Sequence, residues 1–268
     1  MTTVIHFPIK TVNKYFLLTV HCSLFMIYCS CNKEDAWDIV KTRGEHVVEE
    51  RAINAFRAIT VKNGINVVLS QGNNDAATID GWKNLMPKIK LSMKKNGVLL
   101  IEDVNKSNFV RSRDNMTTVY LTVSGEIDSV HFSGNGYFLT NDTLFTSRLT
   151  VISFGSGSVD ITVKTPDIYV ATNHGNTASI TIRGQGNSAG ITNWGYAPVD
   201  LSGFETLYAS VAQNGLGNIF VNASQSIDAV FYRGSGNVYY AANPSSVTFI
   251  HKGKAKGNLY RMEDETIF

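Results

Sequence analysis

The sequence predicts an all-β protein built as a solenoid with coils of about 20 residues. Short runs rich in β-branched and aromatic residues dominate the chain, and no run of a dozen residues has apolar side chains at helical spacing. From residue 127 on, one glycine recurs every 19 to 21 residues, with strand-like sequence on both sides, as expected when each unit stacks on the next. These glycines are Gly134, Gly155, Gly175, Gly195, Gly215, Gly234 and Gly253.

The residues around each glycine predict which side chains enter the core. Because side chains alternate between the two faces of a strand, the apolar position four before each glycine indicates an inward strand. The residues expected inside are Val130, Val151, Ala171, Ile191, Val211, Val230 and Phe249. The position four after the glycine is apolar in five of the first six units, with Ser179 the exception, and predicts a second inward strand. Several turns read Gly-x-Gly, which favours a tight corner with positive φ.

A polar column is expected inside the same corner. The position two before the glycine shares the inward parity and reads Ser153, Asn173, Asn193 and Gln213 in consecutive units. A buried polar group without a partner costs about 1 to 3 kcal/mol. We therefore expect these side chains to form a hydrogen-bonded ladder along the stack.

The residues before the repeat are expected to belong to the same domain. Residues 65–69, 97–101 and 119–123 are apolar, β-branched runs bounded by Gly, Asn and Asp, which is typical of strands. We expect one β-solenoid domain over residues 51–268, with less regular strands in 51–126 and repeat coils in 127–262.

The N-terminus predicts an export signal. Lys10 and Lys14 precede an uncharged apolar run over residues 15–29, which is shorter than the roughly 20 residues needed to cross a bilayer. All three cysteines, Cys22, Cys29 and Cys31, lie in or just after this run. A chain cut before Cys31 keeps one cysteine, so neither an internal disulfide nor a zinc cluster of cysteines is expected.

The cleavage region resembles a bacterial lipobox. The small residue Ser30 precedes Cys31, which we expect to be the lipidated residue, so that residues 1–30 form a lipoprotein signal peptide and residues 31–50 a tether. Tyr28 stands where lipoboxes usually carry leucine. The following Asn32-Lys33-Glu34-Asp35 resembles the signal of Bacteroidetes lipoproteins that face the cell exterior. The expected location is the outer membrane, lipid-anchored and facing outward, with the periplasmic face as the alternative.

Charge excludes two classes of partner. The chain has 24 basic and 22 acidic residues, and removal of residues 1–30 would leave 22 of each. This balance of charges lacks the basic excess that is typical of nucleic-acid-binding proteins. We also expect no electrostatic contact with a membrane beyond the lipid anchor.

The sequence resembles the family of the putative auto-transporter adhesin head GIN domain, found in Bacteroidetes lipoproteins. The matching segments include Asn63-Gly64-Ile65-Asn66, Asn96-Gly97-Val98-Leu99 and Gly234-Ser235-Gly236-Asn237, and the resemblance covers roughly residues 47–262. The turns at Gly175 and Gly195 depart from the Ser-Gly-Ser-Gly that members usually carry. The resemblance implies a right-handed β-helix-like fold and carries over no catalytic residue.

Enzymatic and metal chemistry are not expected. The Gly-x-Gly pairs open strands rather than helices, so no nucleotide cofactor is predicted. The histidines lack metal-ligand spacing. Asp160 and Asp200 are both expected to face outward two coils apart, a separation near the upper limit for an inverting glycosidase pair, but with Ile180 between them and no basic partner. We read them as solvated surface acids.

The candidate ligand site is a row of aromatic side chains. Phe154, His174 and Trp194 each stand directly before a glycine on consecutive units, where they should face outward, and Tyr196 lies close to Trp194. Exposed rings in a row stack on sugar faces or on apolar groups of a partner. The competing interpretation is a ladder that only stabilises the solenoid edge, or a row covered by residues 51–126.

These observations lead to one functional prediction. We expect a lipid-anchored cell-envelope protein with an adhesin-like, non-enzymatic module that binds a glycan or an envelope protein. The alternatives are a carbohydrate-active enzyme on a β-helix scaffold and a purely structural envelope protein.

Overall fold

The computed structural model describes residues 44–105 and 116–262. The predicted signal peptide, Cys31 and most of the predicted tether lie outside these residues. Within them, no helix is long and apolar enough to cross a membrane.

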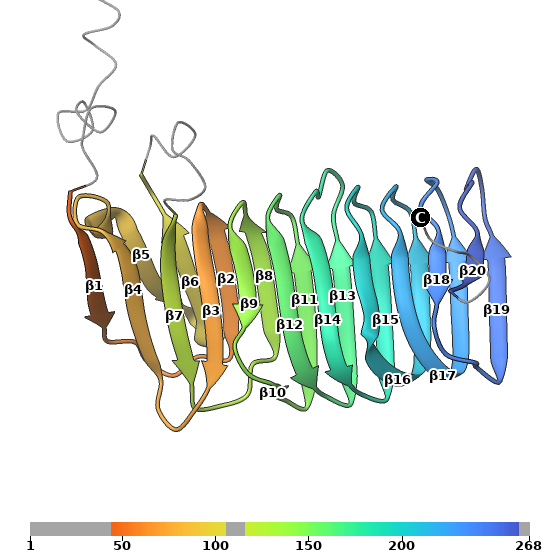
Figure 1. The fold of residues 1–268 in the computed structure, drawn as a ribbon, viewed down its shortest axis with the longest axis horizontal. Helices are drawn as coiled ribbons and strands as arrows, with labels where there is room; N and C mark the ends of the chain where they lie inside the picture. The colour runs from red at the N-terminus through yellow and green to blue at the C-terminus, as the bar shows by residue number, and fades with distance from the viewer. Residues whose placement is uncertain (1–43, 106–115, 263–268) are drawn as a thin grey trace, which may run out of the picture. The chain divides into compact units, whose positions relative to one another are not determined.

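The described residues form an all-β solenoid (Figure 1). The two short 3-10 helices are η1 (Met86–Lys88) and η2 (Lys95–Gly97). The strands before the glycine repeat are β1 (His46–Arg51), β2 (Ala58–Asn63), β3 (Ile65–Gln71), β4 (Ala76–Trp82), β5 (Ile89–Lys94), β6 (Val98–Asp103) and β7 (Thr117–Val123). The strands of the repeat are β8 (Ser129–Gly134), β9 (Tyr137–Thr140), β10 (Leu144–Phe145), β11 (Arg148–Ser153), β12 (Ser158–Lys164), β13 (Asp167–Thr172), β14 (Ser179–Gln185), β15 (Ser188–Asn193), β16 (Val199–Gln213), β17 (Ile219–Phe231), β18 (Val238–Tyr240), β19 (Ser246–His251) and β20 (Leu259–Arg261).

Each coil contributes a strand to each of two stacked sheets. The first sheet runs β5-β6-β2-β8-β11-β13-β15, continues through the second halves of β16 and β17, and ends at β19. The second runs β1-β4-β7-β3-β9-β12-β14, continues through the first halves of β16 and β17, and ends at β18 and β20. The long strands β16 and β17 therefore connect the two sheets.

The pairing register confirms the predicted coil length. In the first sheet the paired positions are Val130, Val151, Val170, Ile191, Val211, Ala229 and Phe249. Their spacings are 21, 19, 21, 20, 18 and 20 residues. The inward residue in the third and sixth units is thus Val170 and Ala229, where the glycine alignment predicted Ala171 and Val230. Likewise Ile180, not Ser179, is buried in the second sheet.

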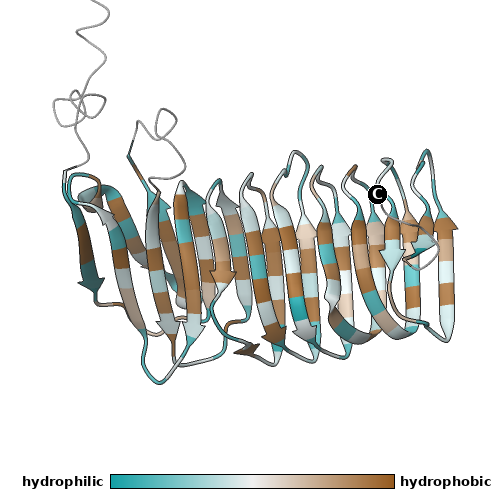
Figure 2. Cartoon of the chain, viewed as in Figure 1, coloured by the Kyte–Doolittle hydropathy of each residue, from teal (hydrophilic) through white to brown (hydrophobic). Residues whose placement is uncertain are grey.

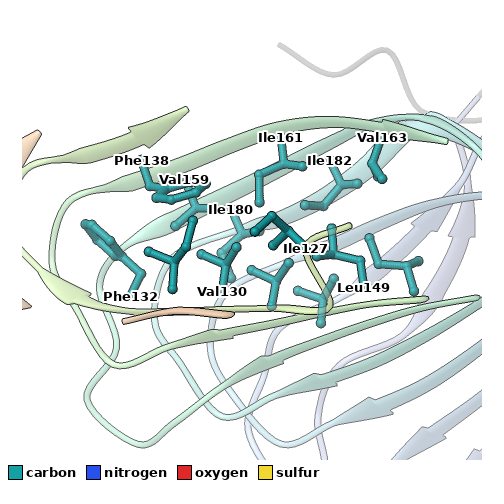
Figure 3. Packing of buried hydrophobic residues seen from close by; sticks show 14 of the residues in the cluster. Ile127, Val130, Phe132, Phe138, Leu149, Val159, Ile161, Val163, Ile180 and Ile182 are labelled. Carbon is teal, nitrogen blue, oxygen red and sulfur yellow. The ribbon is translucent and has the colours of Figure 1, made fainter. Parts of the chain in front are cut away.

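The core lies between the two sheets. Apolar and polar residues alternate along the strands (Figure 2). Val159, Ile161 and Ile182 of the second sheet face Val130 and Leu149 of the first (Figure 3). Val211 is 2% exposed, as predicted. Among the described residues, the buried cluster lies within residues 56–238.

The first coils do not stack in chain order. The β2–β3 coil lies between the β6–β7 coil and the β8–β9 coil, because β2 pairs with both β6 and β8 and β3 with both β7 and β9. The chain crosses back over this coil at residues 124–128, where the Asp128 amide donates to the Arg57 carbonyl and the Arg57 and Asp128 side chains form an ion pair at 2.9 Å.

Antiparallel strands close the N-terminal end. β4 pairs with β7, β1 with β4, and β5 with β6, whereas the other pairings are parallel. Since β1 begins at His46, the solenoid starts before the expected boundary at residue 51.

Most glycines at the Gly-x-Gly turns are required by the closeness of the coils. A Cβ at Gly157 would lie 1.7 Å from the Gly136 carbonyl oxygen, and one at Gly217 would lie 1.9 Å from the Ala197 oxygen. The prediction of positive φ at these turns is wrong except at Gly234, with φ of 72°. The backbone of one coil occupies the space in which the side chain of the next would stand.

Candidate functional site

The candidate site lies along the glycine corner, which we define as the turns that join first-sheet strands to second-sheet strands. From Ser153 to Val159, the inward residues on either side of the turn are six positions apart. The corresponding turn from Thr172 to Ile180 is two residues longer. The extra length forms a loop that carries His174.

The predicted polar column is buried with one change of member, and its side chains bond partly to one another and partly to Asn176 and the Gly217 carbonyl. Ser153, Thr172, Asn193 and Gln213 are fully or almost fully buried, whereas Asn173 is exposed. The glycine alignment placed Asn173 inside because it assumed turns of equal length. Thr172 Oγ1 donates to Asn193 Oδ1 at 2.5 Å, and Asn193 Nδ2 donates to the Gly217 carbonyl at 2.8 Å.

The ladder fixes the turns that carry exposed rings. The backbone N–H groups of Trp194 and Gly195 both donate to Thr172 Oγ1 at 3.0 Å. In the next coil Gln213 Oε1 accepts from the Gly215 N–H at 3.0 Å. The outward side chains therefore stand on turns whose backbone is held from inside.

The structure brings three of the four predicted site residues to one part of the corner. The His174 and Trp194 rings lie 4.4 Å apart between centroids at 53°, and Tyr196 follows two residues after Trp194. His174 is exposed, Trp194 is half-buried, and Tyr196 is 56% exposed. In the coil of Thr172, the residue that corresponds to Phe154 is Asn173, not His174. His174 nevertheless contacts Trp194 because the longer loop carries it there.

Phe154 lies on an earlier turn of the same corner. Its side chain is 51% exposed, so the described part of residues 51–126 leaves about half of it uncovered. It borders a groove of about 520 Å3 together with Gly175 of the His174 loop. The predicted aromatic row is therefore one exposed ring at the groove and a cluster of three further along.

An apolar side chain extends this cluster. Leu216 is the central residue of the turn Gly215 to Gly217 and is 52% exposed. Its amide donates to the Gly195 carbonyl, which places it on the coil next to Tyr196. Sequence reasoning missed Leu216, although comparing the central residue of each Gly-x-Gly turn would have found it.

The groove at Phe154 has a mostly uncharged polar lining. Hydroxyl and amide groups dominate, and the lining includes Asn63, Asn105, Ser133, Asn135, Ser156 and Thr177. Asp103 is the one charged residue among the described residues that line it, and it is buried. Asn105 donates from its backbone and side-chain nitrogens to Asp103 Oδ1, at 2.8 and 2.6 Å. The groove thus offers hydrogen-bonding groups with little net charge.

The acids considered for catalysis do not form a pair of free carboxylates. The register places Thr181 between Asp160 and Asp200, correcting the prediction of Ile180 there. Asp160 forms an ion pair with Arg183, a basic partner that the sequence prediction did not find. Asp200 accepts from Ser202. Over residues 44–105 and 116–262, no three His, Cys, Asp or Glu side chains group so as to hold a metal ion.

Fold and corner together define a β-solenoid with a mostly uncharged groove and an aromatic cluster at one edge. The chain belongs to the family described as putative auto-transporter adhesin, head GIN domain, whose model matches residues 55–244. This match confirms the family resemblance noted from the turns and the Asn63-Gly64-Ile65-Asn66 segment.

Solved structures of similar proteins share the fold. A putative adhesin from Bacteroides fragilis has 22% identity and a TM-score of 0.73, with 81% of this chain and 97% of that chain covered. A putative adhesin from Parabacteroides merdae has 17% identity and a TM-score of 0.62, with coverages of 82% and 97%. A putative lipid binding protein from Parabacteroides distasonis has 17% identity and a TM-score of 0.60, again with 82% and 97% covered. No curated protein matches the chain.

Proposed function

We propose that the protein is a lipid-anchored, non-enzymatic module of the outer cell surface that binds a neutral glycan along the glycine corner. The observation that carries this proposal is the mostly uncharged, polar groove at Phe154 on the corner that also bears the His174, Trp194 and Tyr196 rings.

The chemistry of the corner favours a sugar chain. Hydroxyl groups of a glycan can hydrogen-bond to the amide and hydroxyl side chains of the groove, and the apolar faces of pyranose rings stack on aromatic side chains. Asp103 is buried and already accepts from Asn105, so the described residues of the groove lining offer no exposed charge to a ligand. Leu216 beside Tyr196 also suits an apolar protein surface, which is the second candidate for the ligand.

The proposed location rests on the sequence and the family. Lipidation at Cys31 would anchor the chain, and the segment after it would direct it to the outer face of the outer membrane. The name of the family as an adhesin is in keeping with this placement. The tether would join the solenoid at β1.

A binding measurement separates the three functional classes. The chain from residue 32 on, which includes the whole buried cluster, would be applied to a glycan array and hits measured by calorimetry. We expect saturable binding of uncharged oligosaccharides and no cleavage products by chromatography after long incubation. Cleavage would establish the enzyme alternative. Binding only to an envelope protein would replace the glycan as ligand, and failure to bind either would leave the structural role.

A further inference from the structure

The two ends of the coil stack differ in their edge strands. At the N-terminal end of the described solenoid the outermost strands are β1 and β5, which carry the exposed Glu49, Glu50, Lys90 and Lys94. Charged side chains on an edge oppose pairing with a further strand. At the other end of the described solenoid the outermost strands are β19, which pairs only with β17 and contains no Asp, Glu, Lys or Arg, and β20, which carries Arg261.

The end at β19 also leaves core positions uncovered. Phe249 is in register with Val211 and Ala229, two positions whose side chains are 2% and 0% exposed. Phe249 itself is 42% exposed, although it packs against Phe231 with ring centroids 5.1 Å apart. Val247, in register with the fully buried Ile227, is 43% exposed. These side chains have the inward phase of the coil, but no following coil among residues 44–105 and 116–262 covers them.

We propose that β19 pairs antiparallel with β19 of a second copy, so that two solenoids join end to end about a two-fold axis. A strand that pairs with its own copy around such an axis must be antiparallel, and the contact closes on itself without forming a fibre. Stacking of β19 on the N-terminal end of another copy would instead meet the charged strands β1 and β5. This inference is independent of the proposed ligand.

The charges near β19 are compatible with this pairing. Lys252, Lys254 and Lys256 follow the strand directly at one end, and residues 241–245, which precede it, are uncharged. An antiparallel pair would place the lysines of each copy beside the uncharged segment of the other. The lysines of the two copies would therefore lie at opposite ends of the shared ladder, about seven residues or 23 Å apart.

The oligomeric state tests the proposal. Sedimentation of the chain from residue 32 on should show a monomer–dimer equilibrium. Val247→Lys places a charge at the edge and should raise the Kd of the dimer at least about tenfold, as expected when a desolvated contact is lost. Val48→Lys, at an exposed position of β1, is the matched control and should leave the Kd unchanged. A monomer at all concentrations, or a dimer insensitive to Val247→Lys, would overturn the proposal.

Cysteine cross-linking tests the geometry of the pairing and does not require the Val247→Lys variant to fold. The chain from residue 32 on contains no cysteine, so single cysteines can be placed at each position from 246 to 251. An antiparallel pair should give disulfide-linked dimers strongest at one or two adjacent positions and weaker on both sides. Equal cross-linking throughout would contradict it. Dimerisation only after removal of residues 263–268 would identify that segment, rather than a second copy, as the occupant of the edge.

Discussion

The His174 ring contacts the Trp194 ring across two neighbouring coils, with centroids 4.4 Å apart. The contact depends on the two extra residues in the turn between Thr172 and Ile180, which carry His174 beyond the position that an ordinary turn would give it. One longer turn thus creates an aromatic cluster, whereas turns of equal length would place one outward side chain per coil in a straight column.

Truncation of the rings should separate binding from stability. Trp194→Ala is expected to fold and to weaken glycan binding by about 2 kcal/mol or more, since aromatic anchors dominate such contacts. Phe154→Ala should weaken it further. Tyr208→Ala removes a comparably exposed ring outside the corner and serves as the control. If Trp194→Ala with Phe154→Ala leaves the calorimetric affinity unchanged, the ligand binds elsewhere.

The polar ladder should be needed for stability. Thr172→Val keeps the shape of the side chain but removes the hydroxyl that accepts from the Trp194 and Gly195 amides. We expect a loss of about 1 to 3 kcal/mol in the free energy of unfolding, measured with denaturant. Thr150→Val, on the outward face of β11, should change it little. If Thr172→Val and Thr150→Val lowered the free energy of unfolding equally, the hydrogen bonds of Thr172 would not contribute to stability.

A charge in the core should prevent folding. Val211 is buried between the coils of Ile191 and Ala229, so Val211→Asp would place an unpaired carboxylate there. We expect loss of the cooperative thermal transition in circular dichroism. A transition at the wild-type temperature would refute the register.

The glycine corner should reject even a methyl group. Gly157→Ala would force a Cβ against the Gly136 carbonyl oxygen and should destabilise the protein by about 1 to 3 kcal/mol through backbone displacement. Gly125→Ala is the matched control, because a Cβ there meets nothing within 4 Å. Similar unfolding midpoints for the two variants would show that the coils can separate without cost.

The anchor can be tested in cells by metabolic labelling with a fatty acid. Cys31→Ser should abolish labelling and leave an unprocessed precursor, whereas Cys29→Ser should still be labelled. The opposite pattern would move the lipidated residue to Cys29.

The repeat was predictable from sequence because the glycine spacing follows directly from the close approach of the coils. The exact phase was not, since an alignment on glycines assumes turns of equal length. That assumption placed Asn173 inside and Ala171 in the core, where the structure has Thr172 and Val170.

Other features depend on contacts that no local pattern encodes. The insertion of the β2–β3 coil between two later coils follows from pairings such as Ile59 with both Leu99 and Val130. Strand-like runs predicted these strands but not their neighbours. The groove combines residues from five coils, so single-residue patterns could reveal only its exposed ring, Phe154.

The out-of-order coil has a mechanical consequence. In a solenoid stacked in chain order, tension applied at the N-terminus would peel the coils away one after another. Here such tension first detaches β1 from β4, and then meets β2 and β3, each held by a parallel ladder on both sides. Extraction of this coil breaks four ladders, two along β2 and two along β3. A pull applied at residue 44 therefore meets greater resistance once β1 has detached.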